Sequence, residues 1–185
     1  MDAILTSLGL VFVAEMGDKT QILALLLAAR FQKPWPLIGG MLVAVLLNHA
    51  LAGILGVVVA DEVPENWLRW GVAASFLAMA AWLLVPDKAE LPERLAGERN
   101  AFLTALVAFF IAEMGDKTQI ATIVLAARFH SLGLVMIGSS LAMLLADSPV
   151  IWFGERITRR LPGRLLRQIS AGLFAAFGVA VVAGW

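Results

Sequence analysis

The sequence predicts an all-α membrane protein with six transmembrane helices, arranged as two inverted three-helix repeats. Three observations predict this fold: an apolar composition, six windows long enough to span a bilayer, and a duplicated segment. Of the 185 residues, 61% are hydrophobic and only 15% are charged, whereas soluble domains are about half apolar and about one quarter charged. The bilayer is therefore the predicted environment of most of the chain.

Six apolar windows give the predicted helices in order. A spanning helix needs about 20 mostly apolar residues, and such windows lie at 4–28, 36–59, 67–85, 101–127, 132–153 and 165–184. The first window is kept as a span because Asp2 stands where a secretory signal would carry a basic residue. The six tryptophans fall near window ends, where indole rings favour the membrane interface.

Basic residues lie mainly on one side of the predicted membrane. The loops 29–35, 86–100 and 154–164, with their immediate flanks, hold ten Lys and Arg residues, and the opposite side holds two, Arg69 and Arg128. Cytoplasmic loops are enriched in Lys and Arg. These three loops are therefore predicted to be cytoplasmic, with both termini on the other side.

The chain is predicted to be a duplication of a three-span unit. Residues 12–31, FVAEMGDKTQILALLLAARF, match residues 110–129, FIAEMGDKTQIATIVLAARF, at 15 of 20 positions with an offset of 98. The first repeat covers 1–85, a cytoplasmic linker covers 86–100, and the second repeat covers 101–185. Because three is odd, the second copy enters the membrane from the opposite side. Inverted repeats recur in secondary transporters, whose sites lie near the midplane between the repeats.

The heptapeptide EMGDKTQ occurs at the centre of the first predicted span and again at the centre of the fourth. A charged residue there costs roughly 2.5–3.5 kcal/mol, so these charges are expected to face inward and interact. On a continuous helix with about 100° per residue, Glu15, Asp18 and Lys19 share one face, and Glu15 and Lys19 form an i,i+4 pair. The motif glycines, Gly17 and Gly115, allow either close helix approach or a local break.

The acids of both motifs are predicted to converge on one metal ion where the copies meet. They are Glu15, Asp18, Glu113 and Asp116. Four carboxylates and the two motif lysines sum to a charge of −2, which complements one divalent cation. Carboxylate oxygens are hard ligands, suited to Ca²⁺, Mn²⁺ or Mg²⁺ rather than to copper or zinc.

Neighbouring motif residues supply further candidate ligands. The amides of Gln21 and Gln119 add hard oxygen atoms on the same faces. A thioether ligand from Met16 or Met114 would favour Mn²⁺ over Ca²⁺, although a methionine in a membrane helix more often only packs. The choice between Mn²⁺ and Ca²⁺ therefore stays open.

The second helix of each half adds polar residues at corresponding positions, Asn48 and His49 opposite Asp147 and Ser148. Asp147 is a further acid inside a predicted span and is therefore a candidate ligand or proton carrier. Asn48 could supply an amide oxygen. For His49, a role in the site and a hydrogen bond to a neighbouring group both stay open.

A structural role for the motif is one alternative. A buried Glu15–Lys19 ion pair would then fix helix packing while Asp18 caps a helix break. One such pair would fit that role. Two identical motifs, each with an acid left over after pairing with its lysine, favour a transport site instead.

The duplicated signature E-x-G-D-[KR]-[TS], here EMGDKT at 15–20 and 113–118, resembles the cation exchanger family of the Golgi membrane, the thylakoid envelope and bacterial inner membranes, which includes bacterial manganese exporters. The resemblance covers nearly the full chain. It implies transport of Mn²⁺ or Ca²⁺ in exchange for protons, with the motif acids as the binding site. Lys19, Thr20, Lys117 and Thr118 complete the two motifs. The short chain looks like the minimal bacterial form, which implies the inner membrane of a cell with both termini periplasmic.

The predicted function is export of a divalent cation, Mn²⁺ before Ca²⁺, in exchange for protons. The rivals are a small amino-acid exporter with six spans, whose carboxylate substrate a site of charge −2 would repel, and a non-transporting structural protein. No enzyme and no cofactor is predicted, because the chain has no cysteine and only two histidines. A net charge of zero gives no reason to expect a nucleic-acid partner. Pairing of two copies in the membrane stays open.

Overall fold

The computed structural model describes residues 2–85, 99–154 and 163–183, and these residues form helices joined by short turns. The all-α prediction is therefore confirmed for the described part of the chain. Most of the predicted linker, and the basic residues Lys88, Arg94, Arg156, Arg159 and Arg160, lie outside it. The helices are α1 (Asp2–Glu15), α2 (Lys19–Phe31), α3 (Pro34–Glu62), α4 (Glu65–Leu83), α5 (Ala101–Glu113), α6 (Lys117–Phe129), α7 (Leu132–Phe153) and α9 (Gly163–Val182).

The prediction that each motif lies on one continuous helix is wrong. The window 4–28 is divided between α1 and α2, and the window 101–127 is divided between α5 and α6. The physical reason is the motif glycine, since Gly17 has φ +82° and Gly115 has φ +76°, a left-handed conformation that glycine adopts at little cost. Of the two roles predicted for these glycines, the local break is the one that the structure contains.

Three of the described helices are long and apolar enough to cross a membrane, namely Pro34–Glu62, Leu132–Phe153 and Arg164–Val182. The halves of the broken windows are shorter, with 14 residues in α1 and 13 residues in each of α2, α5 and α6. Each broken pair needs both halves to cover the roughly 30 Å of a bilayer core.

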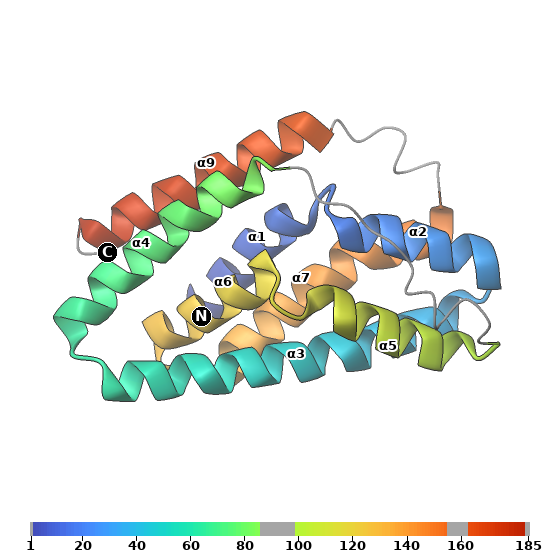
Figure 1. Cartoon of the computed structure of the whole chain (residues 1–185), viewed down its shortest axis with the longest axis horizontal. Coiled ribbons are helices and arrows are strands. Elements are labelled where there is room, and N and C mark those ends of the chain that lie inside the picture. Colours follow the sequence, from blue (N-terminus) through green and yellow to red (C-terminus); the bar gives the residue numbers. More distant parts are fainter. Residues whose placement is uncertain (1, 86–98, 155–162, 184–185) are drawn as a thin grey trace.

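Figure 1 shows the helices running along the long axis of the molecule, with both breaks near its middle. We call the end where α1 begins and α6 and α9 end the terminal end, and the end where α2 ends and α5 begins the far end. Helix α3 packs along α5 and α6, α7 packs along α1 and α2, and α3 contacts α7. Helices α4 and α9 pack on each other as an outer pair.

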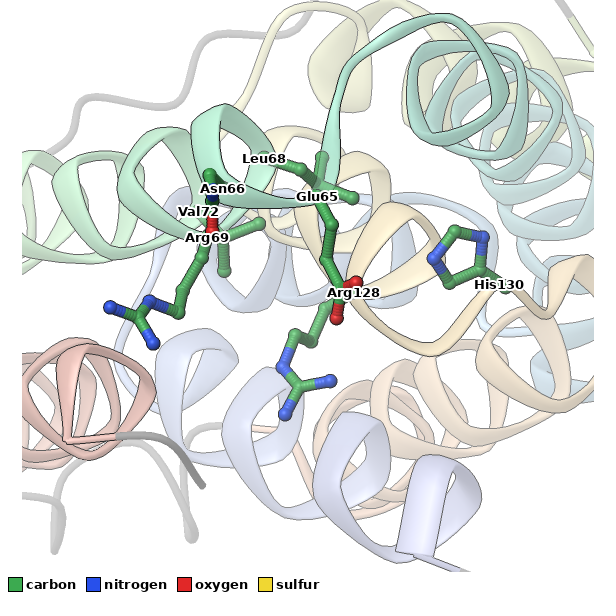
Figure 2. Close-up of a pocket in the computed structure, with 7 residues that line it drawn as sticks. All are labelled: Glu65, Asn66, Leu68, Arg69, Val72, Arg128 and His130. Atoms are coloured by element: carbon green, nitrogen blue, oxygen red, sulfur yellow. The ribbon is translucent and has the colours of Figure 1, made fainter.

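Arg69 and Arg128 are the two basic residues on the side of the predicted membrane that has few Lys and Arg. Both line one pocket at the terminal end. Its volume is about 390 Å³, and its lining includes Glu65, Arg69, Arg128 and His130. Figure 2 shows the Arg69 and Arg128 side chains extending toward the same side of the pocket, from α4 and α6. None of the motif residues lines this pocket. The motif acids lie instead at the two breaks.

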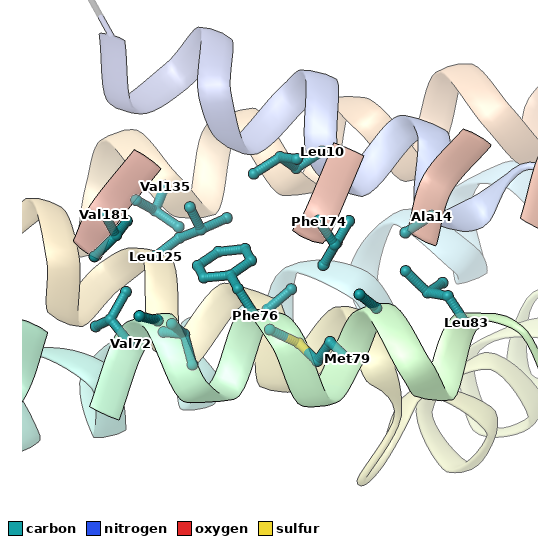
Figure 3. Close-up of a cluster of buried hydrophobic side chains, with 14 of the residues drawn as sticks. Leu10, Ala14, Val72, Phe76, Met79, Leu83, Leu125, Val135, Phe174 and Val181 are labelled. Carbon is teal, nitrogen blue, oxygen red and sulfur yellow. The ribbon is translucent and has the colours of Figure 1, made fainter. Parts of the chain in front are cut away.

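Two apolar clusters hold the helices together. In the first, the outer pair α4 and α9 packs on α1 and α6 through residues such as Leu10, Phe76, Leu125 and Phe174 (Figure 3). The ring centroids of Phe76 and Phe174 are 5.5 Å apart. The second cluster joins α2, α3, α5 and α7, with Met41 and neighbours fully buried. The motifs lie between these clusters.

Close helix crossings depend on glycines without room for a side chain. A Cβ atom added at Gly40 of α3 would collide with the Phe102 carbonyl oxygen and lie 2.9 Å from the Ala105 Cβ atom of α5. We expect Gly40→Ala to lower the free energy of unfolding by about 1–3 kcal/mol, because overpacking forces the backbones apart. Thermal unfolding in detergent checks this. Gly172→Ala, where the added Cβ atom meets nothing within 4 Å, is the control and should not destabilise the protein.

Candidate cation site

Each copy of the motif builds the same local structure around its break. In the first copy, the Gly17 N–H donates to Gln21 Oε1 (2.9 Å), and the Thr20 hydroxyl donates to Glu15 Oε2 (2.6 Å). The second copy repeats both bonds, from Gly115 to Gln119 (2.7 Å) and from Thr118 to Glu113 (2.9 Å). The threonine and glutamine of the heptapeptide therefore hold the glutamate and the glycine turn in place.

The motif aspartates occupy the N-cap positions of the second half-helices. Asp18 precedes α2 and Asp116 precedes α6, both with extended backbone, and neither side chain makes a capping hydrogen bond. Capping by Asp18, part of the structural alternative, is therefore absent. The two carboxylates are directed to other partners.

Those partners are lysines of the opposite copy. Lys19 Nζ lies 3.2 Å from Asp116 Oδ1, and Lys117 Nζ lies 3.4 Å from Asp18 Oδ1. The predicted i,i+4 pair of Glu15 with Lys19 is therefore wrong, because the break interrupts the helix between them and the lysine crosses to the other repeat. Lys117 is almost fully buried, whereas the Lys19 side chain is 20% exposed.

Three of the four predicted acids form one buried group. A carboxylate oxygen from each of Glu15, Glu113 and Asp116 lies within 4.8 Å of the others, an arrangement that could hold a metal ion. Glu15 and Glu113 are fully buried and Asp116 is 3% exposed. Asp18, the fourth predicted acid, does not belong to this group of three; it pairs with Lys117.

Each acid of the group keeps one oxygen without a hydrogen-bond partner among the described residues: Glu15 Oε1, Glu113 Oε1 and Asp116 Oδ2. A buried charge without a partner is costly unless it coordinates a metal or takes up a proton. The donor set is made entirely of carboxylate oxygens, which fits a hard divalent cation. The group can therefore hold either such an ion or protons.

The motif glutamines connect the breaks to α3 and α7. Gln119 Nε2 donates to Asn48 Oδ1 (3.2 Å), and Asn48 Nδ2 donates to the Phe110 carbonyl (3.2 Å). Gln21 Nε2 donates to the carbonyl of Ala146 (3.1 Å), the residue before Asp147. The predicted amide ligands are thus engaged in bracing the two motifs from the second helix of the opposite repeat.

Asp147 is a further buried acid that lies close enough to Glu15 and Glu113 to interact with them electrostatically. It is fully buried, and within the described residues neither carboxylate oxygen has a hydrogen-bond partner. It is not part of the three-acid group. The predicted correspondence of Asp147 with Asn48 is wrong by one residue. Gln119 bonds to Asn48 as Gln21 bonds to Ala146, so the structural counterpart of Asn48 is Ala146 and that of Asp147 is His49.

The remaining predicted residues lie at the edge of the site. His49 Nδ1 is 3.2 Å from Ser140 Oγ, so of the two roles left open for His49 the structure contains the hydrogen bond to a neighbouring group. The partner, on α7, was not predicted, and its only signal in the sequence was the polar pair Ser139–Ser140 inside an apolar window. Met16 Sδ is 3.9 Å from Gln21 Nε2. The Met114 side chain is 58% exposed.

Substitution of Gly115 tests whether the glycine turn at the break is required. Its φ of +76° is unfavourable for other residues, and an added Cβ atom would meet nothing within 4 Å. Gly115→Ala should therefore act through the backbone alone and cost about 1–2 kcal/mol, lowering both thermal stability and cation flux. Gly9→Ala, in helical backbone with open space around it, is the matched control. A Gly115→Ala protein as stable and active as the control would contradict this role of the turn.

Comparison with known proteins connects this site to a family. The sequence model of "Divalent cation/proton antiporter GDT1" matches residues 3–91 and 101–184. A Vibrio cholerae protein named "Putative manganese exporter" is 46% identical over 181 residues, covering 97% of this chain and 90% of that protein. GDT1-like protein sll0615 of Synechocystis is 29% identical over 208 residues, covering 100% and 98%.

A longer plant protein is also similar to this chain. GDT1-like protein 3 of Oryza sativa subsp. indica is 29% identical over 204 residues, which cover 96% of this chain and 72% of that protein. No solved structure matches the chain. The family resemblance carried by the two EMGDKT segments is confirmed: the chain belongs to the GDT1 family of divalent cation/proton antiporters.

Proposed function

We propose that this protein exports Mn²⁺ from the bacterial cytoplasm in exchange for protons, through a single site formed where two inverted repeats meet. The observation that carries the proposal is the buried group of Glu15, Glu113 and Asp116, whose carboxylates come within 4.8 Å of one another in a place where unneutralised charge is costly. An ion or protons must neutralise this group, which is the condition for exchanging one for the other.

Charge balance supports proton exchange. The four motif acids and two lysines sum to −2, so one divalent ion or two protons neutralise them equally. Like charges away from water resist joint ionisation, and the empty site therefore takes up protons. The simplest stoichiometry is one ion for two protons. Asp147, buried beside the brace from Gln21, is placed to carry a proton or to complete the coordination.

The choice of Mn²⁺ rests on the donor chemistry together with the Vibrio relative. Oxygen ligands suit both Mn²⁺ and Ca²⁺, and that relative is named for manganese export. The C-terminal ends of α1 and α5 and the N-terminal ends of α2 and α6 meet at the breaks, so the helix dipoles there offset one another and the carboxylates supply the negative charge of the site.

Equivalent contacts in the two halves support six spans in inverted repeats. Gly40 of α3 meets Phe102 of α5, and Gly138 of α7 meets Ile4 of α1; both members of the second pair lie 98 positions from those of the first. Phe76 and Phe174, which are also 98 positions apart, contact each other. The positive-inside rule then places the far end in the cytoplasm and both termini in the periplasm.

The proposal is tested in a manganese-sensitive bacterium that lacks its own exporter. Expression of this chain should restore growth in added Mn²⁺ and lower cell Mn without lowering cell Ca, and Asp116→Asn should not. Proteoliposomes should show Mn²⁺ flux that rises with an opposing pH gradient. Flux independent of that gradient would contradict proton exchange. If neither the original protein nor the Asp116→Asn variant changed the Mn tolerance of the cells, the result would contradict manganese export and favour the structural role.

A further inference from the structure

The two repeats share a sequence but not the same surroundings. Residues 27–31 and 125–129 both read LAARF, yet Ala29 is exposed whereas its equivalent Ala127 is 3% exposed. The same holds one position earlier, where Ala28 is half-buried and Ala126 is fully buried. Identical sequence therefore packs tightly at the terminal end and loosely at the far end.

A pair of equivalent glycines shows where the packing differs. At Gly56 of α3, an added Cβ atom would collide with the Ile123 carbonyl and lie 2.8 Å from Ala126 Cβ, so α3 and α6 touch through their backbones. At Gly154, 98 positions later, the nearest atom is Leu25 Cδ1 at 3.8 Å. A pocket of about 490 Å³ lies here between the ends of α2 and α7.

The contacts of the outer pair, α4 and α9, are also tighter at the terminal end than at the far end. Helices α4 and α9 pack on α6 and α1, the half-helices of the terminal end (Figures 1 and 3). Within the described chain they make no comparable contact with α5 and α2, the half-helices of the far end. In consequence Leu26 of α2 is 43% exposed and Met114, at the end of α5, is 58% exposed, whereas Val124, the equivalent of Leu26, is 8% exposed.

Contact between equivalent residues provides a pivot. Phe76 of α4 and Phe174 of α9 occupy the same position in their repeats, are buried and touch, so they lie on the axis that relates the two halves. If the tightly packed end and the loosely packed end exchanged their packing, the contact of Phe76 with Phe174 would stay the same. Contacts away from the axis would change. Packed interfaces of this kind have discrete arrangements rather than continuous ones.

We propose that α4 and α9 move as one unit between the α1–α6 half-helices and the α2–α5 half-helices, and that Gly56 and Gly154 are the equivalent points at which the two ends close in turn. The proposal rests on the inverted-repeat transporter proposed above. Since the far end is cytoplasmic in that orientation, the structure corresponds to the state that exchanges ions with the cytoplasm. The opposite state closes α2 on α7 at Gly154 and releases α6 from α3 at Gly56.

The chain offers a matched pair of reporters because it contains no cysteine. Ala29→Cys and Ala127→Cys place one thiol each in the same LAARF sequence. In lipid nanodiscs, where both faces meet solvent, a water-soluble maleimide should label Ala29→Cys at least about tenfold faster than Ala127→Cys, which corresponds to a bias of about 1.4 kcal/mol. Equal rates would overturn the proposal.

A second arm shifts the balance between the two states. Gly56→Ala cannot keep the tight crossing of α3 with α6, so it should slow the labelling of Ala29→Cys and speed that of Ala127→Cys. Gly133→Ala, where an added Cβ atom meets nothing within 4 Å, should change neither rate. Rates that both rise, or that both stay unchanged in Gly56→Ala, would overturn the exchange of packing.

The labelling readout is separate from transport. If the two rates shift in opposite directions while the protein carries no Mn²⁺, the motion stands and the assignment of the ion fails. If Mn²⁺ flux is present while the two thiols react equally, the assignment of the ion stands and the motion fails.

Discussion

Glu113→Gln is expected to lower Mn²⁺ transport on the order of 100-fold, equivalent to about 2.7 kcal/mol, because it removes one charge of a buried charged cluster. Glutamine keeps the length of the side chain, and its carbonyl oxygen can still accept the hydrogen bond from Thr118. The loss should therefore appear in ion flux and ion affinity and not in folding. Flux of ⁵⁴Mn²⁺ into proteoliposomes, with thermal stability measured in parallel, gives both quantities.

The matched substitution in the other repeat is Glu15→Gln, which should have a similar effect because Glu15 is equally buried and is held by Thr20 in the same way. The control is Glu62→Gln at the end of α3, an exposed acid remote from the breaks; it should leave flux unchanged. If Glu113→Gln kept most of the normal flux, the three-acid group would not be the ion site.

Lys117→Met is expected to cause the largest loss of stability, about 3–5 kcal/mol, since removing one member of a buried ion pair leaves the other charge badly compensated. The lysine and Asp18 side chains are 3% and 6% exposed, and their charged atoms are 3.4 Å apart. Chemical unfolding in mild detergent measures the change in free energy. Lys19→Met should cost less, because the Lys19 side chain is 20% exposed and solvent screens its pair.

A double variant separates the pairing from the loss of the lysine itself. Asp18→Asn combined with Lys117→Met removes both charges together, and it should recover much of the stability lost in Lys117→Met alone because no charge remains without its partner. If the double variant were as unstable as the sum of its single variants, the cross-repeat pair would not be the source of the effect.

The helical fold could be predicted from the sequence, and so could the acids that the structure brings together; what those acids bind stays a prediction. Apolar windows of the right length mark helices, and intramembrane acids mark function. Glu15, Glu113 and Asp116 do meet, as the duplication predicted. Gly17 was recognised as a position that tolerates a break, but helical periodicity could not decide between a break and a close crossing.

Partner choice was the part that the sequence could not determine. Periodicity placed Lys19 beside Glu15 on one helix, whereas the structure pairs it with Asp116, 97 positions away. The local sequence does not specify which of the four acids each of the two lysines will pair with when two identical motifs meet. The contact of His49 with Ser140 escaped for the same reason, since it depends on how α3 crosses α7.

The crossed lysine–aspartate pairs also constrain how the protein is made. Asp18 and Lys19 are synthesised 99 and 97 residues before their partners, Lys117 and Asp116. These two charges of the first half therefore lack the ion-pair partners of the folded protein until the second half has been made. Because both halves belong to one polypeptide, each lysine and aspartate of one motif is always accompanied by its partner in the other.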